Sequence, residues 1–509
     1  MFMSSTICII IAIVLYLGMM LYVGYACSKR NSNVDDFYLG GRKLGPIVTA
    51  MSAEASDMSS WLLMGLPGVA YATGIADAAW TAIGLAIGTY LNWLIVARRI
   101  RVYSHTTGSI TLPDFFSNRY GDKKHLLSSV AAVIIIIFFI PYTASGFAAC
   151  GKLFNSLFGI DYMLAMLVSA AIIVGYCALG GFLAASTTDL IQSIVMTIAL
   201  FIVICFGISS AGGWDAVVDN AKALPGYLSL TEIYDPSAGT SSSYSALTIV
   251  STLAWGLGYF GMPHVLLRFM ATEDEDKLKT SRRIATIWVV ISMSVAVLIG
   301  IVGLSMSKAG VLPMLEDSET IIIKIAHVIS QHGIIPALIS GIILSGILAS
   351  TMSTSDSQLL AAASSVSQNI IRDLFGVKMS EKKSMNTARV TVILIAIVAV
   401  FLARNPNSSV FKIVSFAWAG FGATFGPVVL LALFWKRSNQ WGALAGMIAG
   451  GVMVFVWKFG IATLGGVFAI YELLPAFVIA CIVNVVVSLL TPAPSSEVTD
   501  TFDAVAAKM

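Results

Sequence analysis

Long apolar runs, separated by short polar loops, repeat along almost all of this 509-residue chain. A helix that spans a membrane needs roughly 20 consecutive, mainly apolar residues. Thirteen segments meet this description, at 6–26, 46–72, 76–97, 127–155, 162–181, 187–210, 245–263, 282–306, 334–360, 387–403, 409–435, 440–459 and 470–491. The pattern predicts an all-α integral membrane protein with one transmembrane domain over residues 1–491 and a short, polar, mobile tail over 492–509.

The composition is that of a membrane protein rather than a soluble one. The chain is 57% hydrophobic and only 11% charged, whereas soluble domains carry about 25% charged residues. The net charge of +3 gives no reason to expect a nucleic-acid partner. The six cysteines are scattered through apolar segments and form no C-x-x-C pair, and the five histidines show no ligand spacing. Neither a zinc site nor a disulfide framework is indicated.

Basic residues set the expected orientation. Cytoplasmic loops of membrane proteins are enriched in Lys and Arg. If the N-terminus lies outside, thirteen crossings place 23 of the 30 Lys and Arg residues in inside loops. We therefore expect an external N-terminus and a cytoplasmic C-terminus. The two longest loops, 98–124 and 211–244, are too short to carry an enzyme domain.

The second apolar segment contains a carboxylate, Asp57, among several serines. An ionisable group at bilayer depth is costly and usually functional. Gly65, Pro67 and Gly68 follow it, so we expect the helix to be interrupted there, with backbone carbonyls and the carboxylate facing a small cation. The alternatives are a polar helix end near the surface, or an Asp that hydrogen-bonds a neighbouring helix.

The seventh segment should be interrupted as well. Three glycines and Pro263 fall within eight residues, which disfavours an unbroken helix. If the first segment is set aside, the two interrupted helices are numbers one and six of the remainder. Interruptions at matching positions of two halves are typical of inverted-repeat transporters, although a kinked structural helix with a glycine packing seam would give the same sequence.

Hydroxyl side chains cluster in the ninth segment, at 350–357. Hydroxyl oxygens suit a hard cation such as sodium. Ser350 lies three residues before Ser353 and four before Thr354, so the three share one helical face. For any single residue the alternative is a hydroxyl that bonds back to its own helix.

These segments resemble the sodium/solute symporter family and, within it, the bacterial sodium/proline symporters. The similarity runs over about residues 5–490. It rests on the runs at 57–68, 255–264, 268–271, 417–423, 425–427 and 442–447.

The resemblance implies a fold and an activity. The fold would be leucine-transporter-like, with one extra N-terminal helix, two five-helix repeats of inverted topology (about 46–210 and 245–435) and two extra C-terminal helices. The activity would be sodium-coupled import of L-proline by alternating access across a bacterial inner membrane, with Na⁺ as coupling ion, no ATP and no obligatory protein partner.

The resemblance also implies site residues. The sodium ion would bind backbone carbonyls of Ala55, Met58 and Ser350 and hydroxyls of Ser353 and Thr354. Asp57 would lie beside it, and Asp189 would be a second carboxylate on the inner side of the ion path. The substrate pocket would comprise Ser59, Ser60, Trp61, Tyr142, Trp255 and Tyr259.

Several positions depart from the family pattern. Ser60 replaces a usual Gly, Met262 a common Gln, and Glu54 a small residue; Ser350 replaces a usual Ala, and a usual Trp is missing from 187–189. The first two leave the substrate open, so a symporter for another amino acid or a monocarboxylate is the main rival. A sensor or receptor is disfavoured by the short tail. A membrane enzyme is disfavoured because no paired carboxylate, metal-ligand set or nucleophile–base couple accompanies Asp57.

Overall fold

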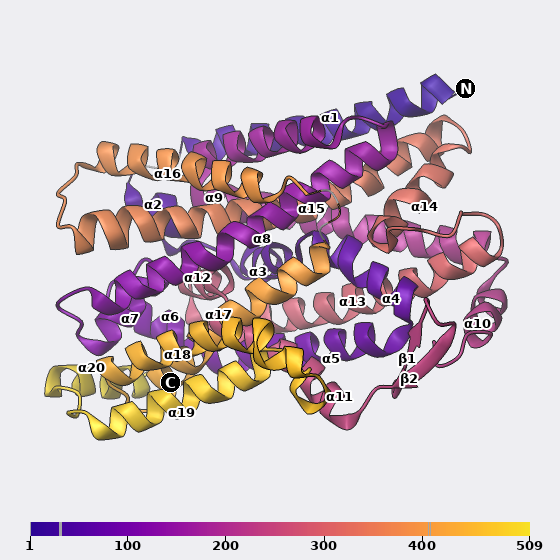
Figure 1. Cartoon of the computed structure of the whole chain (residues 1–509). Coiled ribbons are helices and arrows are strands. Elements are labelled where there is room, and N and C mark those ends of the chain that lie inside the picture. Colours follow the sequence, from indigo (N-terminus) through magenta and orange to yellow (C-terminus); the bar gives the residue numbers. More distant parts are fainter. Residues whose placement is uncertain (1, 30–32, 406, 408) are drawn as a thin grey trace.

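The computed structural model describes residues 2–29, 33–405, 407 and 409–509, and it is a bundle of long, roughly aligned helices (Figure 1). The first half contains α1 (Phe2–Ser28), α2 (Val34–Leu39), α3 (Pro46–Ser60), α4 (Leu66–Thr73), α5 (Ile75–Leu91), α6 (Ala97–Thr106), α7 (Leu112–Tyr120), α8 (Leu126–Phe158), α9 (Tyr162–Ser210) and α10 (Trp214–Lys222). The second half contains β1 (Glu232–Asp235), β2 (Thr240–Ser243), α11 (Ala246–Leu253), α12 (Pro263–Ala271), α13 (Leu278–Lys308), α14 (Ile321–Ser330), α15 (Ile334–Ser364), α16 (Glu381–Leu402), α17 (Val410–Phe434), α18 (Gln440–Phe459), α19 (Leu473–Leu490) and α20 (Ser496–Ala506).

The prediction of an all-α membrane protein is confirmed. In the described part of the chain, ten helical stretches are long and apolar enough to cross a membrane. The other three predicted segments, 46–72, 162–181 and 245–263, are shorter or interrupted helices. The count of thirteen crossings therefore stays a prediction.

The fifth and sixth predicted segments are not separated by a loop. They lie in α9, which consists of two helices joined at a kink at Gly181 (φ 64°, ψ −167°). This positive φ costs little for glycine, which lacks a Cβ atom. Ser186 and Thr188, on either side of the predicted boundary between the two segments, are helical and buried.

The two ends of the bundle carry different accessory elements. Figure 1 places the N-terminus, α10, α14 and the β1–β2 hairpin at one end, and α7 and α20 at the other. The antiparallel hairpin, with Glu232 opposite Ser243, lies in a loop for which no strands were predicted.

The tail, which was predicted to be polar and mobile, contains a helix. Residues 496–506 form α20, which lies against α6 and α7. Lys436 Nζ lies 2.5 Å from Asp503 Oδ2, and the Arg119 guanidinium lies over the Phe502 ring at 4.9 Å. One apolar face of this short helix, with Val498 and Val505 buried, supplies the packing that the polar composition concealed.

Helices α3 and α15 occupy the middle of the bundle. Every residue of α3 from Thr49 to Ser60 is buried, although seven of these twelve side chains are polar or charged. Helix α15 packs against α1, α3, α8 and α9. A polar helix buried on all sides needs internal partners, and these partners define the candidate site.

Candidate functional site

The interruption predicted near Asp57 is present and is confined to one residue. Ser59 has φ 45° and ψ −171°, and a π-helical turn over Trp61–Gly65 follows before α4. A positive φ at a residue other than glycine costs about 1–3 kcal/mol and occurs mostly at functional sites. The break leaves the Trp61 N–H bonded to the Met58 carbonyl and, at 3.1 Å, to Ser59 Oγ.

The second predicted interruption is also present. Residues Ala254–Gly261 form a tight 3₁₀ helix, Met262 is extended (φ −77°, ψ 110°), and α12 begins at Pro263. The glycine packing seam is real too, because a Cβ atom on Gly256 would collide with the backbone of Gly84 in α5. The interruption and the glycine packing seam are therefore both present in this segment.

Asp57 lies where the two interrupted helices meet. Tyr259, in the 3₁₀ segment, donates its hydroxyl to Asp57 Oδ2 at 2.6 Å. Tyr142, in α8, donates to the Asp57 backbone carbonyl at 3.1 Å. The carboxylate is 6% exposed, and its Oδ1 atom has no hydrogen-bond partner among the described residues. A buried carboxylate with a free oxygen is well suited to a cation.

The hydroxyl cluster of α15 faces α3 next to this point. Ser353 Oγ donates to the Ala55 carbonyl at 2.8 Å and approaches the Ser350 carbonyl at 3.2 Å. Thr354 Oγ1 also bonds the Ser350 carbonyl, at 3.2 Å. The Ser350 hydroxyl instead bonds back to the Ile347 carbonyl at 2.8 Å. Four of the five predicted sodium ligands are thus brought together, whereas the fifth, the Met58 carbonyl, receives the Trp61 N–H.

The other predicted carboxylate, Asp189 of α9, lies beside Ser52 of α3. It accepts Ser52 Oγ at 2.6 Å and Arg268 Nη2 at 3.1 Å, and both charged side chains are almost fully buried (0% and 1% exposed). Arg268 also donates to Ser52 and to Ser357 of α15. Asp189 therefore has a cation of its own, whereas Asp57 has none in the described structure.

The predicted pocket side chains are buried in an aromatic cluster. The Trp61 and Trp255 ring centroids lie 5.7 Å apart, and Phe411 of α17 lies 6.1 Å from the first and 5.5 Å from the second. Trp418 stands edge-on to Tyr259 at 5.1 Å. The Ser60 hydroxyl and the Trp61 indole N–H have no partners within the described residues, so both are available to a ligand.

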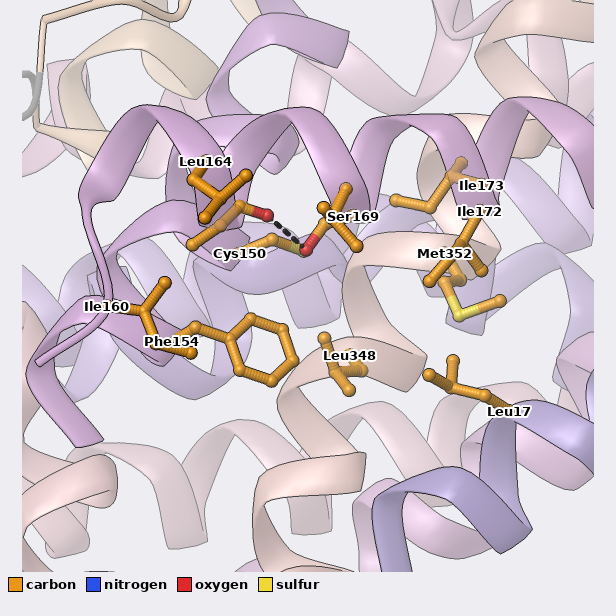
Figure 2. Close-up of a pocket in the computed structure, with 12 residues that line it drawn as sticks. Leu17, Cys150, Phe154, Ile160, Leu164, Ser169, Ile172, Ile173, Leu348 and Met352 are labelled. Atoms are coloured by element: carbon orange, nitrogen blue, oxygen red, sulfur yellow. Dashed lines mark hydrogen bonds between the residues drawn. The ribbon is translucent and has the colours of Figure 1, made fainter. Parts of the chain in front are cut away.

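Two cavities near these helices differ in the chemistry of their lining. A cavity of about 590 Å³ borders the aromatic cluster, because Phe411 belongs to both. It is lined by Gly65, Gly68, Phe411 and the charged residues Asp77, Lys152, Glu316, Asp317, Glu319 and Lys412. A smaller cavity, of about 270 Å³, lies between α1, α8, α9 and α15 (Figure 2). Its lining, which includes Leu17, Phe154 and Leu348, is apolar, so it does not suit a charged solute.

Sequence reasoning missed several contacts of this site. Phe411 carried no signal, because nothing local in the sequence shows that the start of α17 reaches Trp61. The sequence did give a signal for Arg268, because an arginine in an apolar helix needs an anionic partner. The partners of Glu54, which accepts Thr89 Oγ1 at 3.1 Å and Trp93 Nε1 at 2.8 Å, were also beyond prediction.

The chain was compared with known proteins. The model of the sodium:solute symporter family matches residues 37–450. The osmoregulated proline transporter OpuE of Bacillus subtilis is 42% identical over 490 residues, covering 96% of each chain. The high-affinity proline transporter PutP of the same organism is 43% identical, over 95% of this chain and 98% of its own. A sodium/proline symporter of Staphylococcus aureus is 39% identical over 96% and 93%, respectively.

Two solved structures have a similar fold. A Na⁺-coupled sialic acid symporter in a substrate-bound, outward-open state superposes with a TM-score of 0.77 at 18% identity, covering 96% of this chain and 99% of its own. A nucleobase-cation-symport-1 family transporter in a closed conformation gives 0.52 at 13% identity, covering 92% and 98%.

Helices of membrane length that are interrupted around a shared polar centre are the architecture of a secondary transporter. The chain belongs to the sodium:solute symporter family. The prediction of a transporter rather than an enzyme is thereby confirmed.

Proposed function

We propose that this protein is a sodium-coupled symporter that imports L-proline by alternating access. The observation that carries the proposal is the 39–43% identity to three proteins named as proline transporters or symporters, over nearly the whole chain. The buried aromatic cluster beside Asp57 is consistent with it, because proline joins an apolar ring to a charged ammonium. Aromatic rings bury the methylenes, and their faces attract the cation.

The sodium ion would bind between α3 and α15. The carbonyls of Ala55, Met58 and Ser350 and the hydroxyls of Ser353 and Thr354 would be its ligands. In the described structure Ser353 already bridges the two helices, so an ion there would replace one hydrogen bond by several ion–oxygen contacts. Asp57 would supply nearby negative charge.

The substrate would bind on the side of Asp57 that faces away from the proposed sodium site. Its pocket would comprise Ser59, Ser60, Trp61, Tyr142, Trp255 and Tyr259. Tyr142 and Tyr259 both contact Asp57, so an ion that orders the interrupted helix also orders the pocket. Sodium should then raise proline affinity, and proline should raise sodium affinity by the same factor.

The proposed topology has thirteen crossings, arranged as one N-terminal helix, two inverted five-helix repeats and two C-terminal helices. The N-terminus would be external and the C-terminus cytoplasmic, in the inner membrane of a bacterium. The position of the N-terminus and α20 at opposite ends of the bundle in Figure 1 supports an odd number of crossings. Asp189 and Arg268 would then lie on the inner side of the path.

The energetics are sufficient for accumulation. Moving one charge through about 100 mV contributes about 2.3 kcal/mol, and a tenfold sodium gradient adds about 1.4 kcal/mol. One sodium ion per proline therefore supports accumulation of several hundredfold without ATP.

The test is uptake of labelled L-proline in vesicles, with sodium replaced by choline as control. A panel of unlabelled amino acids and monocarboxylates added in excess identifies the solute. Uptake that needs sodium and is inhibited best by proline supports the proposal. Best inhibition by another solute would assign the transporter to that solute instead.

A further inference from the structure

An apolar groove lies on the outside of the bundle, where the proposed function assigns no role. It has a volume of about 590 Å³ and lies between α8, α16 and the π-helical segment Ser365–Leu374 that continues α15. No residue of the proposed sodium or substrate site lines it. Its apolar walls are formed by Ile136, Ile140, Ile371, Val390, Leu394 and Val398.

The groove is open to the hydrocarbon of the bilayer. Val390, Leu394 and Val398 are spaced four residues apart on α16, so they form a stripe along one face of that helix. Their exposed fractions are 55%, 58% and 46%. Because α16 is one of the helices long and apolar enough to cross a membrane, this exposed stripe faces lipid.

One end of the groove is polar. Lys383, Asn386 and Thr387, on the first two turns of α16, line it there. Lys383 has no ion-pair partner among the side chains that the structure describes, whereas the nearby Arg372 is paired with Asp373. The polar end of the groove therefore presents a free ammonium group.

This end lies at the cytoplasmic face in the proposed topology. Figure 1 places the turn between α15 and α16 at the end of the bundle that carries α7 and α20. The segment 372–389, which contains this turn, has five basic and two acidic residues. Basic clusters directly beside a membrane-spanning helix attract the anionic lipids of the cytoplasmic leaflet.

The length of the groove fits one leaflet. The stretch 383–394 of α16 is about 16 Å long, at about 1.5 Å per residue. Half of a bilayer core is about 15 Å thick. A cation at the membrane surface, followed by an apolar stripe that reaches the middle of the bilayer, has the shape and polarity of a phospholipid.

The charge selects the class of lipid. A soluble anion such as phosphate would pair with Lys383 but would leave the apolar stripe uncovered. A zwitterionic phospholipid would cover the stripe but would bring its own cation next to Lys383, where like charges repel. An anionic phospholipid satisfies both ends of the groove.

We propose that this groove binds an anionic phospholipid of the inner leaflet, with its phosphate on Lys383 and Asn386 and one acyl chain along the stripe. Bound there, the lipid bridges α16, α8 and the end of α15. The last two helices also carry Tyr142 and Ser353 of the proposed transport site, so the lipid stabilises the frame that holds this site. The proposal goes beyond the proposed function and holds for any transported solute.

Lipid binding to the purified full chain tests the proposal. The protein in detergent is titrated with phosphatidylglycerol, and native mass spectrometry gives the dissociation constant of the first bound lipid. Lys383→Gln should raise this constant about fivefold, which is the contribution of one basic residue near a lipid headgroup. Lys382→Gln removes the same charge from an exposed neighbour that does not line the groove, and it should leave the constant nearly unchanged.

A second pair of variants tests the apolar part. Leu394→Trp places a larger side chain at the rim of the groove, where the residue is exposed and no packed core is disturbed. It should weaken phosphatidylglycerol binding several-fold. Ile397→Trp, on the same helix and 60% exposed but outside the groove, should not. Phosphatidylglycerol should also raise the thermal unfolding midpoint of wild type more than phosphatidylcholine with the same acyl chains, and this difference should shrink in both groove variants.

Five results would each overturn the proposal. Equal losses in Lys383→Gln and Lys382→Gln would show diffuse attraction to the basic segment rather than a site. Unchanged binding by Leu394→Trp would remove the acyl chain from the groove. Competition by glycerol phosphate at the same concentration as the lipid would assign the polar end to a soluble anion. Equal affinity for phosphatidylcholine would exclude selection of an anionic headgroup. A wild-type dimer that Leu394→Trp makes monomeric would make the groove an interface between two copies of the chain.

Discussion

Replacing Ser353 by alanine should weaken sodium binding far more than the same change at Ser350. Ser353 Oγ points across to the Ala55 carbonyl of α3 at 2.8 Å, and we propose it as a sodium ligand. The Ser350 hydroxyl bonds its own helix at Ile347, and only its carbonyl, which alanine retains, is a proposed ligand. The two substitutions are chemically identical and three residues apart in one buried helix.

The magnitude follows from the contact that is lost. A hydrogen bond to a charged group is worth about 1.5–3 kcal/mol, and we take the loss of one hydroxyl ligand from the ion to be similar. Since about 1.4 kcal/mol changes an equilibrium constant tenfold, Ser353→Ala should raise the half-saturating sodium concentration by roughly tenfold to a hundredfold. Ser350→Ala should change it by less than about threefold, the effect of one weak neutral hydrogen bond.

The assay is equilibrium binding of labelled proline to purified protein over a range of sodium concentrations. Because binding couplings are reciprocal, proline affinity at subsaturating sodium should fall in parallel in Ser353→Ala. At saturating sodium it should recover, which separates a lost ligand from a damaged pocket. Equal effects of the two substitutions, or a loss that saturating sodium does not rescue, would refute the assignment.

Three further results are expected. Asp57→Ala should remove most of the sodium dependence of uptake while expression and thermal stability stay near wild type; an unchanged sodium response would exclude this carboxylate. Trp255→Ala should raise the proline concentration for half-maximal uptake by about fivefold or more, since a truncated buried aromatic typically costs over 1 kcal/mol, whereas the exposed Trp441→Ala should not. Glu319→Gln should lower the thermal unfolding midpoint in detergent, because this carboxylate accepts Lys152 Nζ and the N–H groups of Val410 and Phe411 at the start of α17; a midpoint equal to wild type would show that the neutral amide caps the helix as well.

The parts of the fold that depend on local sequence were predictable. Hydrophobic runs located the helices, because burial in a bilayer demands length and apolarity. Glycine and proline content indicated that both helices are interrupted, because these residues weaken helices wherever they stand. Ser59 illustrates the limit of such reasoning, since the strained φ falls on a serine rather than on the nearby glycines.

Contacts between distant segments were not predictable from one sequence. Nothing near Phe411 shows that its ring covers Trp61 and Trp255, and nothing near Thr89 shows that it meets Glu54. The helical tail was missed for a related reason, because its few apolar residues make sense only against α6 and α7. The Ser350 hydroxyl bonds its own helix, whereas the Ser353 hydroxyl bonds across to α3. Which of the two a hydroxyl does likewise depends on which helix lies opposite.

The most direct test of the account is solute accumulation in proteoliposomes under an imposed inward sodium gradient, with labelled L-proline as solute. We predict transient accumulation above the external concentration, which vanishes when sodium is equal on both sides and no membrane potential is applied. Proline that only equilibrates across the membrane, at the same rate with and without the gradient, would contradict sodium-coupled proline symport.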